Sequence, residues 1–494
     1  MGPTPATKRA ALLNACKRND HDAIQILTRF KQEAQRAEDF DAIAGTAHLY
    51  LKQYDDACDH LQRALSKPRQ RRIDIYQNLL VALDNLARID EYKEVTKRLA
   101  VEFADSQQFA VARAKVLHSD GCYREALAHI NSALALDSRC ILAEAAATAI
   151  HACTTKDHAQ QPSVVDRQLL ELAFLCLHDA GESDEALALV NRLIHLFPSA
   201  TGLLANKAIV QLKQRQFEEG FKNYQTRETR PFGLTKDKED RAWTLMNEKR
   251  ALQVVAEQGL GDTLQFARYL YRLPSSVAVH FCPQEPLYDL YKSCATPFSV
   301  ARPAELSQST PTVSLMSLPH LTGEKGFSLS DHCNYLRGTA SDGRSIGVVW
   351  KGNQKYKNDF NRSIRLQEVV HLIKRDNATI VQQGLTDEEA QLLGANNLKP
   401  IHLGSFQDTR KLLNTLAGVV TVDTSVAHLA GAMGIRTVVV LPHNSDWRWH
   451  DDQYLSSWYN TIYLVRRAQT DRTGALAFER ALMLLQELVQ SKQA

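Results

Sequence analysis

Two glycines and an aspartate, Gly259, Gly261 and Asp262, form a first group of residues whose types and spacing suit chemistry. They follow an apolar run at residues 252–256, which we expect to be a strand, and precede an expected helix at residues 263–273. The glycines permit a tight turn and a close approach of the backbone to a ligand. Asp262 could take a proton from a hydroxyl group, or it could cap the helix by accepting backbone N–H groups. Because the spacing is not G-x-G-x-x-G, a Rossmann dinucleotide site is disfavoured.

A basic loop at residues 351–364 supplies a second group. Between Arg344 and Asp376 the sequence has eight Lys or Arg residues against three Asp or Glu residues. Basic side chains after a strand suit a diphosphate, and arginine can hold its oxygens in a bidentate way. Four side chains are the best candidates for such contacts: Lys351, Lys357, Arg362 and Asn353. The alternative is a solvated, charged loop.

A third group lies in VDTSVAHLAGAMG, residues 422–434. Asp423 closes an expected strand, and Thr424 and Ser425 begin an expected helix. Free N–H groups, two hydroxyls and the helix dipole together form an anion site. His428 lies one helical turn after Thr424, on the same face. Alternatively, Thr424 or Ser425 only caps the helix and His428 packs in the core. Because the second and third groups both suit phosphate, together they favour a nucleotide.

The elements that position these loops alternate between strands and helices. Short apolar runs at residues 277–283, 312–319, 345–350, 378–384, 419–423 and 437–442 predict further strands, separated by helical segments. This order predicts parallel sheets covered on both faces. A polar stretch around residues 335–345 divides the region into two lobes. Of the 22 glycines, 15 lie after residue 240, as do all five tryptophans, so the first half has a different character.

The first half repeats. Six similar segments carry a small or β-branched residue at steps of 34, 38, 31, 60 and 34 residues: Ala23, Ala57, Val95, Ala126, Ala186 and Gly220. Two helical turns further on come Ala64, Ala133 and Leu193. The pattern resembles the tetratricopeptide repeat, a 34-residue helix–turn–helix unit that stacks into an α-solenoid. The alternative is an irregular α-solenoid or a helical bundle. The charged segment at residues 226–245, with its proline and glycine, is interpreted as a linker or a crossing between the halves.

Composition excludes several classes of protein. The chain has 494 residues, a net charge of +3 and no apolar stretch of 18 residues, so neither nucleic-acid binding nor a membrane span is expected. The polar start predicts no signal peptide. Nine scattered cysteines without a C-x-x-C pair indicate reduced thiols and a cytoplasmic protein. Because Walker A, G-x-S-x-G and H-E-x-x-H motifs are missing, an ATPase, a serine hydrolase and a zinc site are disfavoured.

Four segments in order carry a family resemblance: EQGLGDTLQFARYL, GVVWKGNQKYKNDFNRSI, VTVDTSVAHLAGAMGIRTVVVLP and SDWRW. Over residues 245–490 the chain resembles the glycosyltransferase domain appended to bacterial tetratricopeptide proteins. That domain is similar to the heptosyltransferases of glycosyltransferase family 9, which have the GT-B fold of two Rossmann-like lobes. More distantly, the chain is similar to O-linked N-acetylglucosamine transferases, whose N-Q-x-Y-K loop is matched by Asn353, Gln354, Tyr356 and Lys357.

The resemblance implies an inverting, metal-independent glycosyltransferase with a nucleotide-diphosphate sugar as co-substrate and no other cofactor. Asp262 matches the catalytic base. Arg362 and Lys357 match phosphate-binding positions, although the heptosyltransferases have a lysine where Arg362 stands. The element that holds the diphosphate and sugar of the donor is matched by Asp423, Thr424, Ser425 and His428. Further candidates for the site are Gly259, Gly261, Gln265, Lys351, Trp447, Arg448 and Trp449. The first lobe, about 100 residues, is shorter than in that family.

We therefore expect helical repeats at residues 1–235, an acceptor lobe at 236–340 and a donor lobe at 341–494. The leading hypothesis is transfer of a sugar to a protein docked on the groove of the repeats. A second hypothesis has a lipopolysaccharide or oligosaccharide acceptor. A third is a non-catalytic adaptor with a degenerate transferase domain. Solenoid surfaces also leave a homo-oligomer open.

Overall fold

A computed structural model describes residues 40–67, 72–86, 88–135, 164–227, 230–326, 334–336, 345–354, 356, 359–450, 454–468, 470–471 and 473–490. The chain divides into two compact units, Met1–Leu196 and Phe197–Ala494. Each unit is described by itself.

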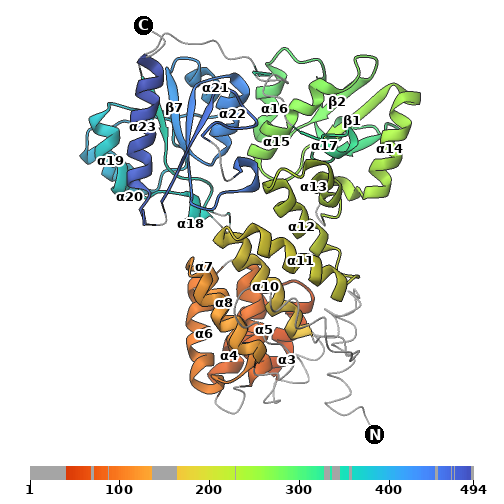
Figure 1. Cartoon of the computed structure of the whole chain (residues 1–494), viewed down its shortest axis with the longest axis vertical. Helices are drawn as coiled ribbons and strands as arrows, with labels where there is room; N and C mark the ends of the chain where they lie inside the picture. Colours follow the sequence, from red (N-terminus) through yellow and green to blue (C-terminus); the bar gives the residue numbers. More distant parts are fainter. Residues whose placement is uncertain are drawn as a thin grey trace. The chain divides into compact units, whose positions relative to one another are not determined.

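The described part of the first unit is helical (Figure 1). Its helices are α3 (Phe40–Tyr50), α4 (Tyr54–Ser66), α5 (Ile73–Asn85), α6 (Ile89–Phe103), α7 (Gln107–Ser119), α8 (Tyr123–Ala135), α10 (Val164–Ala180) and α11 (Ser183–Leu196). From α3 to α8 each helix packs against the next one in the chain, and α10 packs against α8 and α11. This order of contacts is the one that helical hairpins in series require.

The small residues of the repeat pattern lie inside this unit. Ala57, Ala126 and Ala186 are completely buried, and so is Leu193. Close packing also involves glycine, because a Cβ atom on Gly45 of α3 would stand 2.5 Å from Cγ of Leu61 on α4. Helices of a pair thus approach closely where the sequence places its smallest side chains. The tetratricopeptide assignment stays a prediction, and Ala23 falls outside the described residues.

The second unit begins with the helix pair α12 (Gly202–Lys213) and α13 (Phe217–Tyr224). These helices fall in the segment predicted to form repeats, but they pack in the second unit. Helix α12 contacts the turn η6 (Trp447–Trp449), and α13 contacts α17 (Leu318–Leu321). Phe217 and Phe221 of α13 belong to the same buried apolar cluster as the strands that follow.

The interpretation of residues 226–245 as a linker is wrong for its second part. After the turn η2 (Pro231–Gly233), residues Lys236–Lys249 form the helix α14, which Thr235 caps by accepting a hydrogen bond from the N–H of Lys238. The helix packs against the strands β1 (Ala251–Val255) and β4 (Thr312–Ser314) through a narrow apolar face that includes Met246. Its many charged residues hide this face in the sequence, because most of them lie on the solvent side.

The first sheet has four parallel strands in the order β3-β2-β1-β4. They are β1 (Ala251–Val255), β2 (Ala278–Cys282), β3 (Ser299–Val300) and β4 (Thr312–Ser314). The intervening helices and turns are α15 (Leu260–Phe266), η3 (Ala267–Arg272), α16 (Glu285–Lys292), η4 (Pro303–Glu305) and η5 (Leu315–Ser317). The parallel pairing confirms the predicted sheet type. The two-residue edge strand β3 was not predicted.

The second sheet has five parallel strands in the order β6-β5-β7-β8-β9. They are β5 (Ile346–Val349), β6 (Thr379–Ile380), β7 (Gly418–Val422), β8 (Thr437–Leu441) and β9 (Ile462–Arg466). The associated helices are α18 (Asp359–Arg362), α19 (Leu366–Arg375), α20 (Asp387–Ala395), α21 (Phe406–Leu413), α22 (Ser425–Met433) and α23 (Ala475–Gln490).

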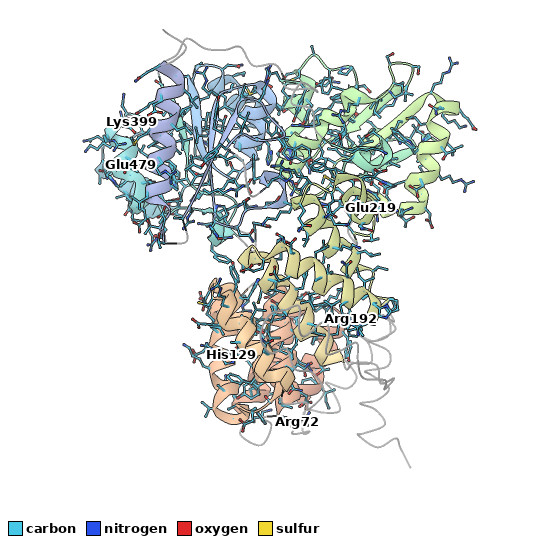
Figure 2. The ribbon with its side chains drawn as sticks, viewed as in Figure 1. Arg72, His129, Arg192, Glu219, Lys399 and Glu479 are labelled. Atoms are coloured by element: carbon cyan, nitrogen blue, oxygen red, sulfur yellow. The ribbon has the colours of Figure 1, made fainter. Side chains whose placement is uncertain are left out.

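Helices cover both faces of this second sheet (Figure 1). Along β7, Val419 packs in the cluster that contains α22, whereas Val420 packs in the cluster that contains α23. This alternation is the two-residue period of a strand buried on both sides. An ion pair of 2.6 Å joins Arg375 of α19 to Glu479 of α23, which is labelled in Figure 2.

The two sheets together determine where the predicted loops lie. The loop after β1 leads into α15, the loop after β7 leads into α22, and α15 packs directly against α22. Two of the three loops predicted to do chemistry therefore come together in the second unit. Among the described residues, no helix is both long enough and apolar enough to cross a bilayer.

Candidate functional site

The loop after β1 holds Asp262 by a capping interaction. Asp262 is the third residue of α15, and its Oδ2 atom accepts a hydrogen bond of 2.8 Å from the N–H of Gly259. The capping role considered for Asp262 is thus confirmed. The preceding residue, Gln258, has a φ of 64°, a left-handed conformation that few residues other than glycine adopt. Such strain is characteristic of functional loops and requires support from the surroundings.

That support comes from a buried ionic network behind the loop. Glu257 receives two hydrogen bonds from Arg227, at 2.5 Å from Nε and 3.1 Å from Nη2, and both side chains are almost completely buried. Ser314, at the end of β4, donates a further hydrogen bond of 2.5 Å to Glu257. The phenol of Tyr224 hydrogen-bonds to the side chain of Gln258. These contacts bind the loop to α13 and β4. They were not predicted from the sequence, because the residues that form them lie far apart in the chain.

Arg448 of η6 pairs with Asp262. Its Nη2 atom lies 2.5 Å from Oδ1 of Asp262, and its Nη1 atom lies 2.8 Å from Oδ1 of Asp446. The guanidinium also covers the ring of Trp447 at 4.4 Å. Burial raises the pKa of Asp262 above its ordinary value, and the positive charge of Arg448 opposes that rise. Asp446 lies in the SDWRW segment, but it was not among the predicted site residues.

Gly261 lets α15 approach α22. A Cβ atom at this position would stand 3.0 Å from Cδ2 of His428 and 3.6 Å from Cα of Ser425. The structure therefore brings the glycine loop that carries Asp262 together with Ser425 and His428, although the two loops follow strands of different sheets.

His428 is a buried, neutral histidine. Its ring stacks on Trp449 at 5.2 Å between centroids, and Nδ1 lies 3.2 Å from the hydroxyl of Tyr459. Burial, aided by the positive charge of Arg448, lowers the pKa of His428 to about 3. At neutral pH the ring can therefore accept or donate a hydrogen bond, but it carries no charge.

The N-terminus of α22 offers polar groups. Thr424 occupies the cap position, yet its hydroxyl makes no capping hydrogen bond and instead lies 3.0 Å from the hydroxyl of Thr421. The preceding Asp423 is close to several charges. Burial and the carboxylate of Asp446 raise the pKa of Asp423 to about 6, against the opposing effect of Arg362 and Arg448.

The loop after β5 contributes Arg362. Its Nε atom lies 3.0 Å from Oδ1 of Asp359, and its guanidinium covers the ring of Tyr356 at 4.7 Å. Since its charge lowers the pKa of Asp423 and also that of His428, Arg362 acts on the same cluster as Arg448. The backbone carbonyl of Asn353 accepts a hydrogen bond from the N–H of Tyr356. Lys357 lies outside the described residues.

Three other predicted site residues, Lys351, Trp447 and Gln265, are buried in the protein interior. Lys351 is buried and forms an ion pair with Glu389, which also receives a hydrogen bond of 3.1 Å from Nε1 of Trp350. Trp447 is buried among Phe221, Tyr224, Phe266 and Trp458. Gln265 is completely buried, and its side-chain amide has no hydrogen-bond partner among the described residues.

The assembled site holds the carboxylates of Asp262, Asp423 and Asp446, two guanidinium groups, a neutral histidine and a helix N-terminus. Among the residues that the structure describes, no group of three His, Cys, Asp or Glu side chains could hold a metal ion. The arrangement can bind an anion at α22, through Arg362 and Arg448, beside a carboxylate that can accept a proton.

Comparisons with known proteins find distant similarities to glycosyltransferases. No family model and no curated protein matches the chain. A solved structure of the iron-containing dodecameric glycosyltransferase TibC from enterotoxigenic E. coli H10407 matches with a TM-score of 0.31 and 13% identity, over 49% of this chain and 76% of that one. A second TibC structure, described as a heptosyltransferase in complex with ADP-D-beta-D-heptose, has a TM-score of 0.28 and 13% identity, over 49% and 75% of the two chains. A point mutant of the O-GlcNAc transferase of Thermobaculum terrenum has a TM-score of 0.29 and 10% identity, over 99% and 93%.

Proposed function

We propose that the second unit is an inverting glycosyltransferase, which moves a sugar from a nucleotide-diphosphate sugar to an acceptor hydroxyl. One observation carries the proposal: Asp262, in the first turn of α15, is paired with Arg448, and its neighbour Gly261 lies against the N-terminal turn of α22, where the charge of Arg362 also acts. A base next to an anion site is what displacement of a diphosphate requires. The family resemblance of the four sequence segments supports the same reaction.

In the proposed reaction, one bond forms and one breaks at the anomeric carbon of the sugar. Asp262 takes the proton of the acceptor hydroxyl, and the acceptor oxygen forms a bond to the anomeric carbon of the sugar. The bond between that carbon and the phosphate oxygen breaks, and its electron pair leaves with the nucleoside diphosphate. Arg362, Arg448 and the N–H groups at the start of α22 stabilise the charge that develops on the leaving group. His428, neutral because of its low pKa, is available as a hydrogen-bonding partner.

The environment of Asp262 suits this role. Burial raises the pKa of its carboxyl above that of an exposed aspartate, which makes the carboxylate a stronger base. The hydrogen bond from Gly259 and the short α15 hold the carboxylate in one place. A side chain that only capped the helix would need neither burial nor a charged partner.

The acceptor that we propose is a protein docked on the helical first unit. The support is the repeat pattern in the sequence and the serial packing of α3 to α8, because stacked helical pairs form extended binding surfaces. The alternative is a saccharide acceptor. It is indicated if the protein transfers the sugar to oligosaccharides and if substitution of exposed polar side chains on the first unit leaves that transfer unchanged.

The experiment is a turnover assay with the full chain. Release of nucleoside diphosphate is measured from ADP-, GDP-, UDP- and dTDP-sugars in the presence of candidate protein and saccharide acceptors. We expect release with one class of donor and a loss of at least a hundredfold in kcat for Asp262→Asn, in line with the usual contribution of a general base. Full turnover by Asp262→Asn would exclude this mechanism. The control variant is Gly394→Ala, because a Cβ at this position of α20 meets open space. Its turnover should equal that of the wild type.

A further inference from the structure

Arg448 is shared between two carboxylates of unequal character. Through Nη1 and its own backbone N–H it binds Asp446, at 2.8 and 3.0 Å, within the same short turn. Through Nη2 it binds Asp262 at 2.5 Å, on the other lobe of the unit. The contact with Asp446 is local, whereas the contact with Asp262 joins residues that lie far apart in the chain. The local contact and the stacking on Trp447 anchor the guanidinium when the distant contact breaks.

The ion pair makes Asp262 a poorer base. One carboxylate oxygen accepts a hydrogen bond from the N–H of Gly259, and the other is ion-paired with Arg448, so both oxygens are already engaged. The positive charge of Arg448 lowers the pKa of Asp262, against the effect of burial. Without Arg448 beside it, the carboxylate would be a stronger base, so departure of Arg448 favours proton transfer from an acceptor hydroxyl.

A diphosphate is the competitor with the chemistry to move it. It carries more negative charge than a carboxylate, and arginine binds phosphate oxygens through paired N–H groups. Arg448 still has a spare donor, because its buried Nε atom has no hydrogen-bond partner among the described residues. The start of α22 is where such an anion can reach Arg448, because Gly261, the neighbour of Asp262, lies against Ser425 of that turn, and the charges of Arg362 and Arg448 both lower the pKa of Asp423 there.

We infer that Arg448 is a donor-operated clamp on Asp262: without a donor it pairs with the base, and the diphosphate of the donor draws it away and frees the base. This inference rests on the proposed function. It predicts that the donor binds before the acceptor reacts, and that Asp262 and the diphosphate compete for one guanidinium.

A double-mutant cycle measures this competition. Inorganic pyrophosphate is the probe, and its affinity is measured by isothermal titration calorimetry for the full-length wild type, Asp262→Asn, Arg448→Met and the double variant. We expect Asp262→Asn to bind pyrophosphate roughly tenfold more tightly, because Arg448 no longer has to leave a charged partner. Arg448→Met should bind it roughly tenfold more weakly. The gain from Asp262→Asn should vanish in the Arg448→Met background.

Each other outcome overturns a particular claim. If the gain from Asp262→Asn persists in the Arg448→Met background, it is a general effect of removing a negative charge, and the clamp is refuted. If Asp262→Asn binds pyrophosphate as the wild type does, the clamp is also refuted, although the proposed anion site stands. If none of the variants nor the wild type binds pyrophosphate or a nucleotide sugar, the proposed function itself fails.

Two further variants guard against loss of folding. Arg448→Lys keeps the charge, so it should retain part of the pyrophosphate affinity and part of the gain from Asp262→Asn. Arg302→Met removes an arginine that pairs with Glu285 at 3.2 Å outside the site, and it should leave pyrophosphate affinity unchanged. A structural role for Arg448 alone would lower the melting temperature of Arg448→Met without producing coupling to Asp262.

Discussion

Gly352 begins a chain of hydrogen bonds that ends at Arg362 and holds it in place. The substitution Gly352→Ala therefore tests whether Arg362 binds the donor. The N–H of Gly352 donates to Oγ of Ser363 at 2.9 Å, and the hydroxyl of Ser363 donates to Asp359 at 2.8 Å. Asp359 in turn accepts from Arg362 at 3.0 Å. A Cβ at position 352 would stand 2.5 Å from Oδ1 of Asp359 and 2.6 Å from Nη2 of Arg362.

The size of the effect follows from these contacts. Both clashes are far inside van der Waals contact, but the atoms are the ends of flexible side chains that can move. Gly352 has no positive φ, so alanine is not strained at this backbone conformation. We therefore expect the fold to persist, with a loss of about 1–2 kcal/mol in the free energy of unfolding from the broken ion pair. Affinity for the nucleotide sugar should fall about tenfold, the value of one misplaced charge-assisted contact.

The assay compares calorimetric donor affinity and urea denaturation of Gly352→Ala with those of Gly394→Ala. Gly394 lies in α20, and a Cβ there meets open space, so alanine should leave affinity unchanged and stabilise the helix by about 0.5–1 kcal/mol. If Gly352→Ala bound the donor as tightly as the wild type, Arg362 in its observed position would not be a donor contact.

Four further predictions concern stability. His428, with a pKa of about 3, makes the protein lose up to about 1.4 kcal/mol per pH unit as pH falls below 6.5, because only the unfolded state takes up the proton. Asp423, whose pKa is raised to about 6, has the opposite effect: as pH falls from 6 to 3.8 the folded state takes up the proton first, which stabilises it. The variant Asp423→Asn lacks this gain, so its free energy of unfolding, measured by urea denaturation, should fall more steeply than that of the wild type as pH is lowered. Equal slopes would contradict the buried environment of Asp423. Trp447→Ala should cost about 3–5 kcal/mol in the free energy of unfolding, and a loss below about 1 kcal/mol would be incompatible with its burial. Lys351→Met should cost about 3–5 kcal/mol by leaving Glu389 unpaired, and Glu389→Gln in the same chain should restore much of it; no recovery would show that the pair is not the cause.

Much of the α/β region could be predicted because its strands are continuous apolar runs. The predicted strand at residues 252–256 is β1 displaced by one residue, and the predicted runs at 419–423 and 437–442 correspond to β7 and β8. The helix α14 was missed because its buried face is narrow and its other faces are charged. The edge strands β3 and β9 were not recognised either, since a short or half-polar strand differs little from a loop in sequence.

The candidate site could be predicted in part. The strand pattern predicts that Asp262 follows β1 and Ser425 follows β7, but these strands belong to different sheets, so the contact between the two loops does not follow from the pattern. The pairing of Asp262 with Arg448 could not be foreseen, because nothing in the spacing of two distant residues indicates their contact. Likewise, the partner of Lys351 is set by the position of α20, so a lysine that follows a strand has the same sequence signature whether it faces a ligand or Glu389.

The central claim is that the start of α22, with Arg362 and Arg448, holds the diphosphate of a nucleotide sugar. Its most direct test is a thermal-shift measurement of the full chain against ADP-, GDP-, UDP-, dTDP- and CMP-sugars, for the wild type and for Arg362→Ala. A ligand that binds only the folded state raises its melting temperature. The account predicts a selective rise with one diphosphate class, reduced in Arg362→Ala and missing with CMP-sugars, which have a single phosphate. A rise that is equal in Arg362→Ala, or no rise with any diphosphate sugar, would contradict it.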